Sequence, residues 1–179
     1  MRGNRHHEQR VPSPWIVRFA PEVPRGARVL DLACGGGRHS HLFLKRDCRV
    51  LAVDRDISGM GYLAHWPTLQ TLQMDLETGE PFPPRGARFD AVVVVNYLYR
   101  PLLSNLVAAV APGGALIYET FAQGNEAFGK PSNPDYLLRP GELLDAVWGA
   151  LKIVAYEDLV VEKPARAAVQ RIYARRESS

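Results

Sequence analysis

The stretch Arg28-Val29-Leu30-Asp31-Leu32-Ala33-Cys34-Gly35-Gly36-Gly37 decides the fold. Its first six residues are mostly apolar and predict a buried strand, and its glycines predict a tight turn into a helix through residues 40–44. A strand that passes through glycines into a helix opens a βαβ unit. Glycine allows positive φ and a close approach of the backbone to a ligand, so this turn is also the first candidate binding site.

Strands and helices alternate along the rest of the chain. Further strands are predicted at residues 49–54, 69–74, 89–95 and 115–120, and helices at residues 14–19, 57–65, 101–110 and 141–148. Residues 151–161 and 167–174 predict two last strands, which a short turn around Lys163-Pro164 joins into an antiparallel hairpin. The pattern predicts an α/β fold: a doubly wound, mostly parallel seven-stranded sheet with a C-terminal antiparallel hairpin.

Composition limits the class of protein. The 179 residues carry a net charge of +3, and 46% of them are hydrophobic, which fits one globular domain. We expect a domain over residues 14–175 and a flexible tail over residues 1–13. Two cysteines make no disulfide framework, and the sequence shows neither a signal peptide nor a membrane-spanning run, so we expect a cytoplasmic protein without a membrane partner. The basic residues gather near both ends, which favours solvated termini over a nucleic-acid-binding face.

Two aspartates follow predicted strands. Asp54 ends the second strand, where a carboxylate can accept hydrogen bonds from both hydroxyls of a ribose. Asp75 ends the third strand, where the amino group of an adenine is expected. Each has a structural alternative, since Asp54 is also a possible helix cap and Asp75 a possible loop cap. Ligands of such sheets bind at the carboxyl ends of the strands, so both aspartates and the glycine turn predict one adenosine site.

The combined pattern resembles the class I S-adenosylmethionine-dependent methyltransferases, with a Rossmann-like methyltransferase fold, over residues 28–121. Their first motif, acid-x-Gly-x-Gly-x-Gly, appears here with Ala33 at the first glycine. The resemblance implies S-adenosylmethionine as cofactor, its methionine near Asp31 and Gly35, its ribose at Asp54, and its adenine at Asp75 and Leu76. The cofactor-binding residues it implies are Asp31, Ala33, Gly35, Gly37, Asp54, Asp75, Leu76 and Asn96.

A finer resemblance comes from Tyr118-Glu119-Thr120-Phe121, Gly129-Lys130-Pro131, Leu137-Leu138 and Gly141-Glu142-Leu143. These stretches resemble a group of small bacterial methyltransferases close to the tellurite-resistance methyltransferases. The resemblance supports the cofactor and leaves the substrate open. A nicotinamide dehydrogenase is disfavoured, because its fingerprint requires glycine where this chain has Ser40.

The acceptor side is less defined. Transfer from a sulfonium requires alignment and exclusion of water, and it requires a base only when the acceptor must lose a proton. The fourth strand ends in Asn96-Tyr97-Leu98-Tyr99, which differs from the Asn-Pro-Pro-Tyr signature of base amino-group methylation. The catalytic candidates are Asn96, Tyr97, Tyr99 and His39, with packing as the alternative for both tyrosines and for the histidine. No metal site is expected.

The long segment 121–139 is a candidate lid over the methyl-donor site, with a rigid structural loop as the alternative. The substrate-binding candidates are Trp15, Phe121, Phe128, Lys130, Tyr136 and Arg139. The sequence thus predicts S-adenosylmethionine-dependent methyl transfer to an unidentified acceptor, with a small molecule favoured. A non-catalytic S-adenosylmethionine-binding protein that acts through a partner and an RNA methyltransferase are the alternatives. The oligomeric state stays open.

Overall fold

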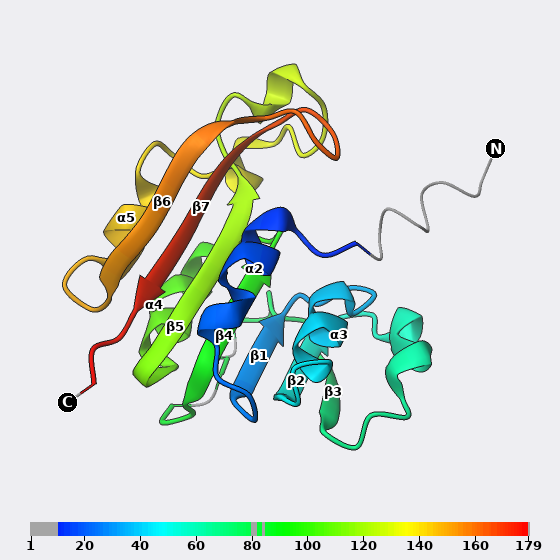
Figure 1. Ribbon diagram of the computed structural model, residues 1–179. Helices are drawn as coiled ribbons and strands as arrows, with labels where there is room; N and C mark the ends of the chain where they lie inside the picture. The colour runs from blue at the N-terminus through cyan, green and yellow to red at the C-terminus, as the bar shows by residue number, and fades with distance from the viewer. Residues whose placement is uncertain (1–10, 80–81, 84, 179) are drawn as a thin grey trace.

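A computed structural model describes residues 11–79, 82–83 and 85–178, which form one seven-stranded sheet with helices on both faces (Figure 1). The strand order is β3-β2-β1-β4-β5-β7-β6, and every neighbouring pair is parallel except β5–β7 and β7–β6. The strands are β1 (Arg28–Leu32), β2 (Arg49–Asp54), β3 (Leu69–Gln73), β4 (Phe89–Val95), β5 (Val110–Phe121), β6 (Lys152–Val161) and β7 (Ala167–Arg175).

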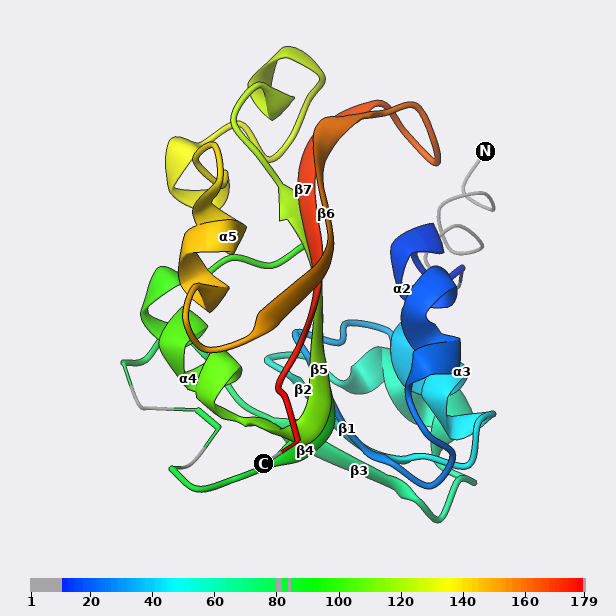
Figure 2. The same ribbon diagram turned by 60° about the vertical axis from the view of Figure 1, so that its left-hand side comes forward.

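The helices form two outer layers (Figure 2). One layer holds α2 (Pro14–Phe19) and α3 (Arg38–Leu44), and the other holds α4 (Leu103–Ala108) and α5 (Glu142–Val147). Each face of the sheet has its own cluster of buried apolar side chains. Short 3₁₀ turns complete the chain at Ala20–Glu22 (η1), Ser58–Leu63 (η2), Arg100–Leu102 (η3), Asn125–Ala127 (η4) and Pro134–Tyr136 (η5).

The expected fold class is confirmed. Strand β4 shows why its sequence pattern predicted a central strand of the sheet. Residues 91–94 of β4 have no exposed surface, because the strand lies inside the sheet with a layer of helices over each face. An unbroken apolar run is typical of such a strand. The order of the parallel strands reverses between β1 and β4, so ligands are expected at their carboxyl ends, beside the glycine turn.

The predicted boundary of β5 was wrong. The sequence predicted a helix to residue 110, a turn at Pro112-Gly113-Gly114 and a strand from Ala115, whereas α4 ends at Ala108 and β5 begins at Val110. The strand tolerates these residues because it is irregular there, with φ of +75° at Gly113 and a register shift against β4. The Gly113 N–H donates to the Arg176 carbonyl at 3.0 Å, so the antiparallel partner provides the hydrogen bond that continues the strand.

The start of the chain also differs from the expected flexible tail. Residues 1–10 lie outside the described residues, but Ser13 is buried and caps α2, its Oγ accepting from the Trp15 N–H at 3.1 Å. Residues 11–13 therefore approach the sheet as an ordered segment. In the part of the chain that the structure describes, no helix is long and apolar enough to cross a membrane.

Candidate functional site

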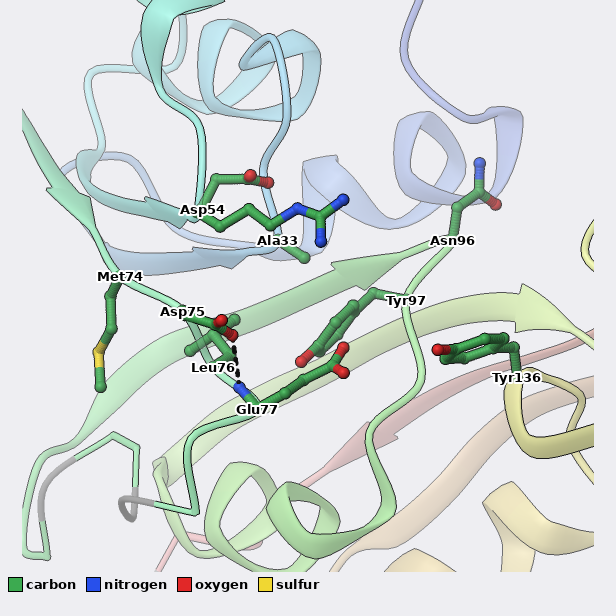
Figure 3. A pocket seen from close by; sticks show the side chains of 10 residues that line it. Ala33, Asp54, Met74, Asp75, Leu76, Glu77, Asn96, Tyr97 and Tyr136 are labelled. Atoms are coloured by element: carbon green, nitrogen blue, oxygen red, sulfur yellow. Dashed lines mark hydrogen bonds between the residues drawn. The ribbon is translucent and has the colours of Figure 1, made fainter.

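A cavity of about 450 Å³ opens at the carboxyl ends of β1 to β4, at the point where the strand order reverses (Figure 3). Each of the four strands contributes residues from its end, and the segment 121–139 adds one side chain from the far side. The lining residues are Ala33, Asp54, Arg55, Met74, Asp75, Leu76, Glu77, Asn96, Tyr97 and Tyr136. The structure thus brings together five of the eight residues predicted to bind cofactor: Ala33, Asp54, Asp75, Leu76 and Asn96.

The glycine turn has the conformation that its sequence predicts. Ala33, Gly35 and Gly37 have φ of +53°, +52° and +76°, in the left-handed region that glycine adopts without strain. A Cβ on Gly37 would lie 2.8 Å from Met60 Cε, so this position also requires a small residue for packing. Ala33 adopts the same conformation with a Cβ, which explains why glycine is the usual residue at the first position of the motif.

Asp54 is oriented by the backbone of the turn. Its Oδ2 accepts from the Gly35 N–H at 2.7 Å and its Oδ1 from the Asp56 N–H at 3.0 Å. A carboxylate has about four acceptor positions. Two therefore remain free for donors in the cavity, which fits a ribose with two adjacent hydroxyls.

The adenine side of the predicted site is also formed. Asp75 Oδ1 accepts from the Glu77 N–H at 2.9 Å, which fixes the loop after β3 (Figure 3). Its second oxygen has no hydrogen-bond donor among the described residues. Leu76 is buried in the core and lines the cavity, so it supplies an apolar surface beside the carboxylate.

Asp31 lies below the cavity and does not line it. The side chain is buried and accepts from Ser40 Oγ at 2.6 Å. Burial raises the pKa of Asp31 to about 6, against the opposing effects of Ser40 and Arg38. Asp31 therefore links β1 to the first turn of α3. This link stabilises the glycine turn, which joins these two elements.

Asn96 and Tyr97 follow β4 in a constrained turn. Asn96 has a φ of +56°, and the Tyr97 carbonyl accepts from the hydroxyl of buried Tyr118 at 2.7 Å. The Tyr97 side chain extends toward Leu76 and Glu77, on the side of the cavity formed by the loop after β3 (Figure 3). Burial, followed by the charges of Glu77 and Asp75, raises the pKa of Tyr97, so the phenol stays protonated. Tyr99 is not among the lining residues.

His39, a catalytic candidate from the sequence, is buried and hydrogen-bonded within the fold. Its Nε2 accepts from the Ser13 N–H at 3.1 Å, and burial lowers the pKa of His39 to about 3, with a smaller effect from Arg38. Ser13 Oγ also donates to Glu119 Oε1 at 2.7 Å. These two contacts fasten the segment before α2 to α3 and to β5. The lone pair that a general base needs is occupied in this arrangement.

The six substrate-binding candidates lie in different places. Tyr136 alone among them lines the cavity. Trp15 is buried in the core, with its indole N–H donating to the Ile172 carbonyl at 3.3 Å. Phe128 lies below the guanidinium of Arg166, on the hairpin turn. The others, which do not line the cavity, are Phe121 at the end of β5, Lys130 on the surface and Arg139 beside α5.

Arg100 and Glu142 hold the end of the segment 121–139. Arg100 donates to both oxygens of Glu142, from Nε at 2.7 Å and from Nη2 at 2.9 Å. The same guanidinium donates to the carbonyls of Asp135 and Leu137 at 2.7 and 2.8 Å. Glu142 also accepts from the Arg139 N–H at 2.8 Å. This Arg100–Glu142 clamp therefore fixes the backbone on both sides of Tyr136.

Sequence reasoning missed the roles of Ser13, Glu119, Arg100 and Glu142. Both glutamates stand inside stretches that carried the finer resemblance, so a signal was present. Their partners lie far away along the chain: Ser13 is 106 residues from Glu119, and Arg100 is 42 residues from Glu142. Among the residues that the structure describes, no group of three or more His, Cys, Asp or Glu side chains is placed to hold a metal ion.

The comparison with protein families identifies the family of the chain. Residues 4–145 match the model of a methyltransferase domain. The chain belongs to this family. The expectation of a methyltransferase, and hence of an enzyme, is confirmed. No curated protein sequence matches the chain.

Solved methyltransferases share the fold. TehB from Haemophilus influenzae superposes with a TM-score of 0.76 at 16% identity, covering 93% of this chain and 63% of its own. A TehB-like S-adenosylmethionine-dependent methyltransferase from Corynebacterium glutamicum gives 0.64 at 19% identity, with 91% and 87% covered. The 1,6-didemethyltoxoflavin-N1-methyltransferase of Burkholderia thailandensis, with bound S-adenosylhomocysteine, gives 0.71 at 20% identity, with 98% and 82% covered. The methyltransferase described here thus spans less than two thirds of TehB, and it shares the fold of the TehB-like proteins.

Proposed function

We propose that this methyltransferase binds S-adenosylmethionine in the cavity at the ends of β1 to β4 and transfers its methyl group to a small molecule. The observation that carries the proposal is the pair of carboxylates, Asp54 and Asp75, on adjacent strand ends in one cavity. Both face a space lined by Ala33 of the glycine turn and by buried Leu76. Two hydrogen-bond acceptors beside an apolar surface match the hydroxyl and amino donors of an adenosine.

The protein contributes binding and orientation. When bound, the cofactor supplies a methyl group that its positive sulfur already activates toward a nucleophile. Asp54 is held by two backbone N–H groups, so its free acceptor positions have a fixed direction. Asn96 follows β4 and lines the cavity together with Ala33 of the glycine turn and Tyr136 of the segment 121–139. The acceptor site is proposed on this side, with Tyr136 as part of its wall.

The same geometry supports a small acceptor. Tyr136 reaches the cavity from the segment 121–139, which the Arg100–Glu142 clamp holds in place (Figure 3). A wall of this kind favours a compact acceptor over a long polymer. The toxoflavin-precursor enzyme among the structural neighbours acts on a small heterocycle, which supports a small-molecule acceptor here.

Calorimetry with S-adenosylhomocysteine tests the cofactor site. The wild-type protein is expected to bind it, and Asp54→Ala is expected to weaken binding by about tenfold or more, because two charge-assisted hydrogen bonds are lost. Asp56→Ala is the matched control, since its exposed carboxylate accepts from the Ser58 N–H at 2.9 Å and does not line the cavity. Measurable binding of NAD without binding of S-adenosylhomocysteine would contradict the proposal.

A further inference from the structure

Tyr97 lines the cavity and has a buried hydroxyl without a hydrogen-bond partner among the described residues. Such a group has lost its hydrogen bonds to water without gaining others, so it calls for an explanation. Of the four described residues with such an atom, Tyr97 alone lines the cavity. Its ring points toward Leu76 and Glu77 (Figure 3). The missing partner is therefore expected on the ligand.

The backbone holds this side chain in place. Asn96 turns the chain through a left-handed conformation, and the Tyr97 carbonyl is fixed by the hydroxyl of Tyr118, which is itself buried. Leu98, the next residue, is packed in the core. The backbone of Tyr97 is thus held at three points, which fixes the position from which its side chain enters the cavity.

The surrounding charges decide which kind of hydrogen bond Tyr97 makes. The carboxylates of Asp54, Asp75 and Glu77 also line the cavity. Ionised carboxylates only accept hydrogen bonds, so they match the amino and hydroxyl donors of an adenosine. The ring nitrogens of adenine are acceptors and need a donor. Of the lining side chains that can donate, Arg55 and Asn96 are exposed, and Tyr136 enters from the opposite side.

We infer that the Tyr97 hydroxyl donates a hydrogen bond to a ring nitrogen of the cofactor's adenine. Tyr97 then contributes to cofactor specificity and belongs to the adenosine side of the cavity, whereas the sequence made it a catalytic candidate on the acceptor side. The inference rests on the proposed function, because it requires an adenosine-containing cofactor in this cavity. It leaves Tyr136 as the aromatic residue of the acceptor side.

Removal of one hydroxyl tests the inference. Tyr97→Phe is expected to weaken binding of S-adenosylhomocysteine by about three- to tenfold, the range for loss of one neutral hydrogen bond. Tyr99→Phe is the matched control: it removes a tyrosine hydroxyl two residues away that does not line the cavity. Thermal unfolding of each variant shows whether the change affects the fold instead of the ligand.

Ligand analogues identify the atom that accepts the bond. The 1-deaza, 3-deaza and 7-deaza analogues of S-adenosylhomocysteine each replace one ring nitrogen by carbon. We expect one of them to bind the wild-type protein about three- to tenfold more weakly than S-adenosylhomocysteine, and to show no such loss with Tyr97→Phe. That non-additivity is a signature that a merely structural role of Tyr97 does not produce.

The outcomes separate the two claims. Affinity of Tyr97→Phe within twofold of wild type overturns the inference, and so does an equal penalty for every analogue in both proteins. In either case weakened binding by Asp54→Ala still supports the proposed function. Absence of S-adenosylhomocysteine binding by the wild-type protein removes both.

Discussion

Replacement of Arg100 by leucine tests the clamp on the segment 121–139. The substitution removes two hydrogen bonds to Glu142 and two to backbone carbonyls. The Glu142 side chain is 7% exposed, and the Arg100 side chain is 33% exposed. Breaking a fully buried ion pair costs about 3–5 kcal/mol, and partial solvation of Arg100 lowers this to about 2–4 kcal/mol. For a chain of this length the melting temperature should fall by about 5–15 °C.

Arg139→Leu is the matched control for this prediction. The Arg139 guanidinium approaches the same carboxylate at 3.4 Å, but its side chain is 69% exposed. Such surface contacts contribute about 0–1 kcal/mol. Denaturant unfolding gives the free energies, and hydrogen exchange should show faster opening of residues 134–138 in Arg100→Leu. Equal losses for the two variants, or a loss below about 1 kcal/mol for Arg100→Leu, would refute the clamp.

The pH dependence of the same variant gives a second check. Burial alone would raise the pKa of Glu142, but the hydrogen bonds from Arg100 and the Arg139 N–H outweigh it, so the pKa of Glu142 is lowered. A carboxyl whose pKa is lower in the folded protein stabilises the fold above its ordinary pKa of about 4.3, and this contribution is lost as the pH falls further. The stability difference between wild type and Arg100→Leu should therefore shrink on acidification below about pH 4.

Two further predictions concern the glycine turn. Gly37→Ala should destabilise the fold by about 1–3 kcal/mol in denaturant unfolding, because the position has positive φ and the new Cβ meets Met60 and Leu63; Gly36→Ala, with nothing within 4 Å, should change little, and equal effects would contradict the packing argument. Since the pKa of Asp31 is raised to about 6, the folded state binds its proton more tightly, so stability should fall by up to about 3 kcal/mol from pH 4 to pH 6. Asp31→Asn should remove this fall, and identical pH profiles of the two proteins would show that Asp31 is not its source.

The sequence predicted those parts of the fold that depend on local patterns. The apolar run of β4 and the glycines after β1 each determine their own structure, since burial on both faces and positive φ restrict the residues allowed. The start of β5 depends on a distant partner. Pro112-Gly113-Gly114 predicts a turn, whereas hydrogen bonds of Gly113 and Gly114 with distant Arg176 continue the strand there.

The same distinction explains the candidate site. Asp54 and Asp75 are predictable because a parallel sheet places the ends of adjacent strands together, so position along the chain implies position in space. Direction is not predictable in this way. Tyr97 and Tyr99 have the same residue type at the same strand end, but only Tyr97 of the two lines the cavity. The turn at Asn96 and the Tyr118 contact hold the backbone at Tyr97. Such direction arises from contacts distant in sequence, so a strand-end motif locates a binding site while the identity of each contact must come from the fold.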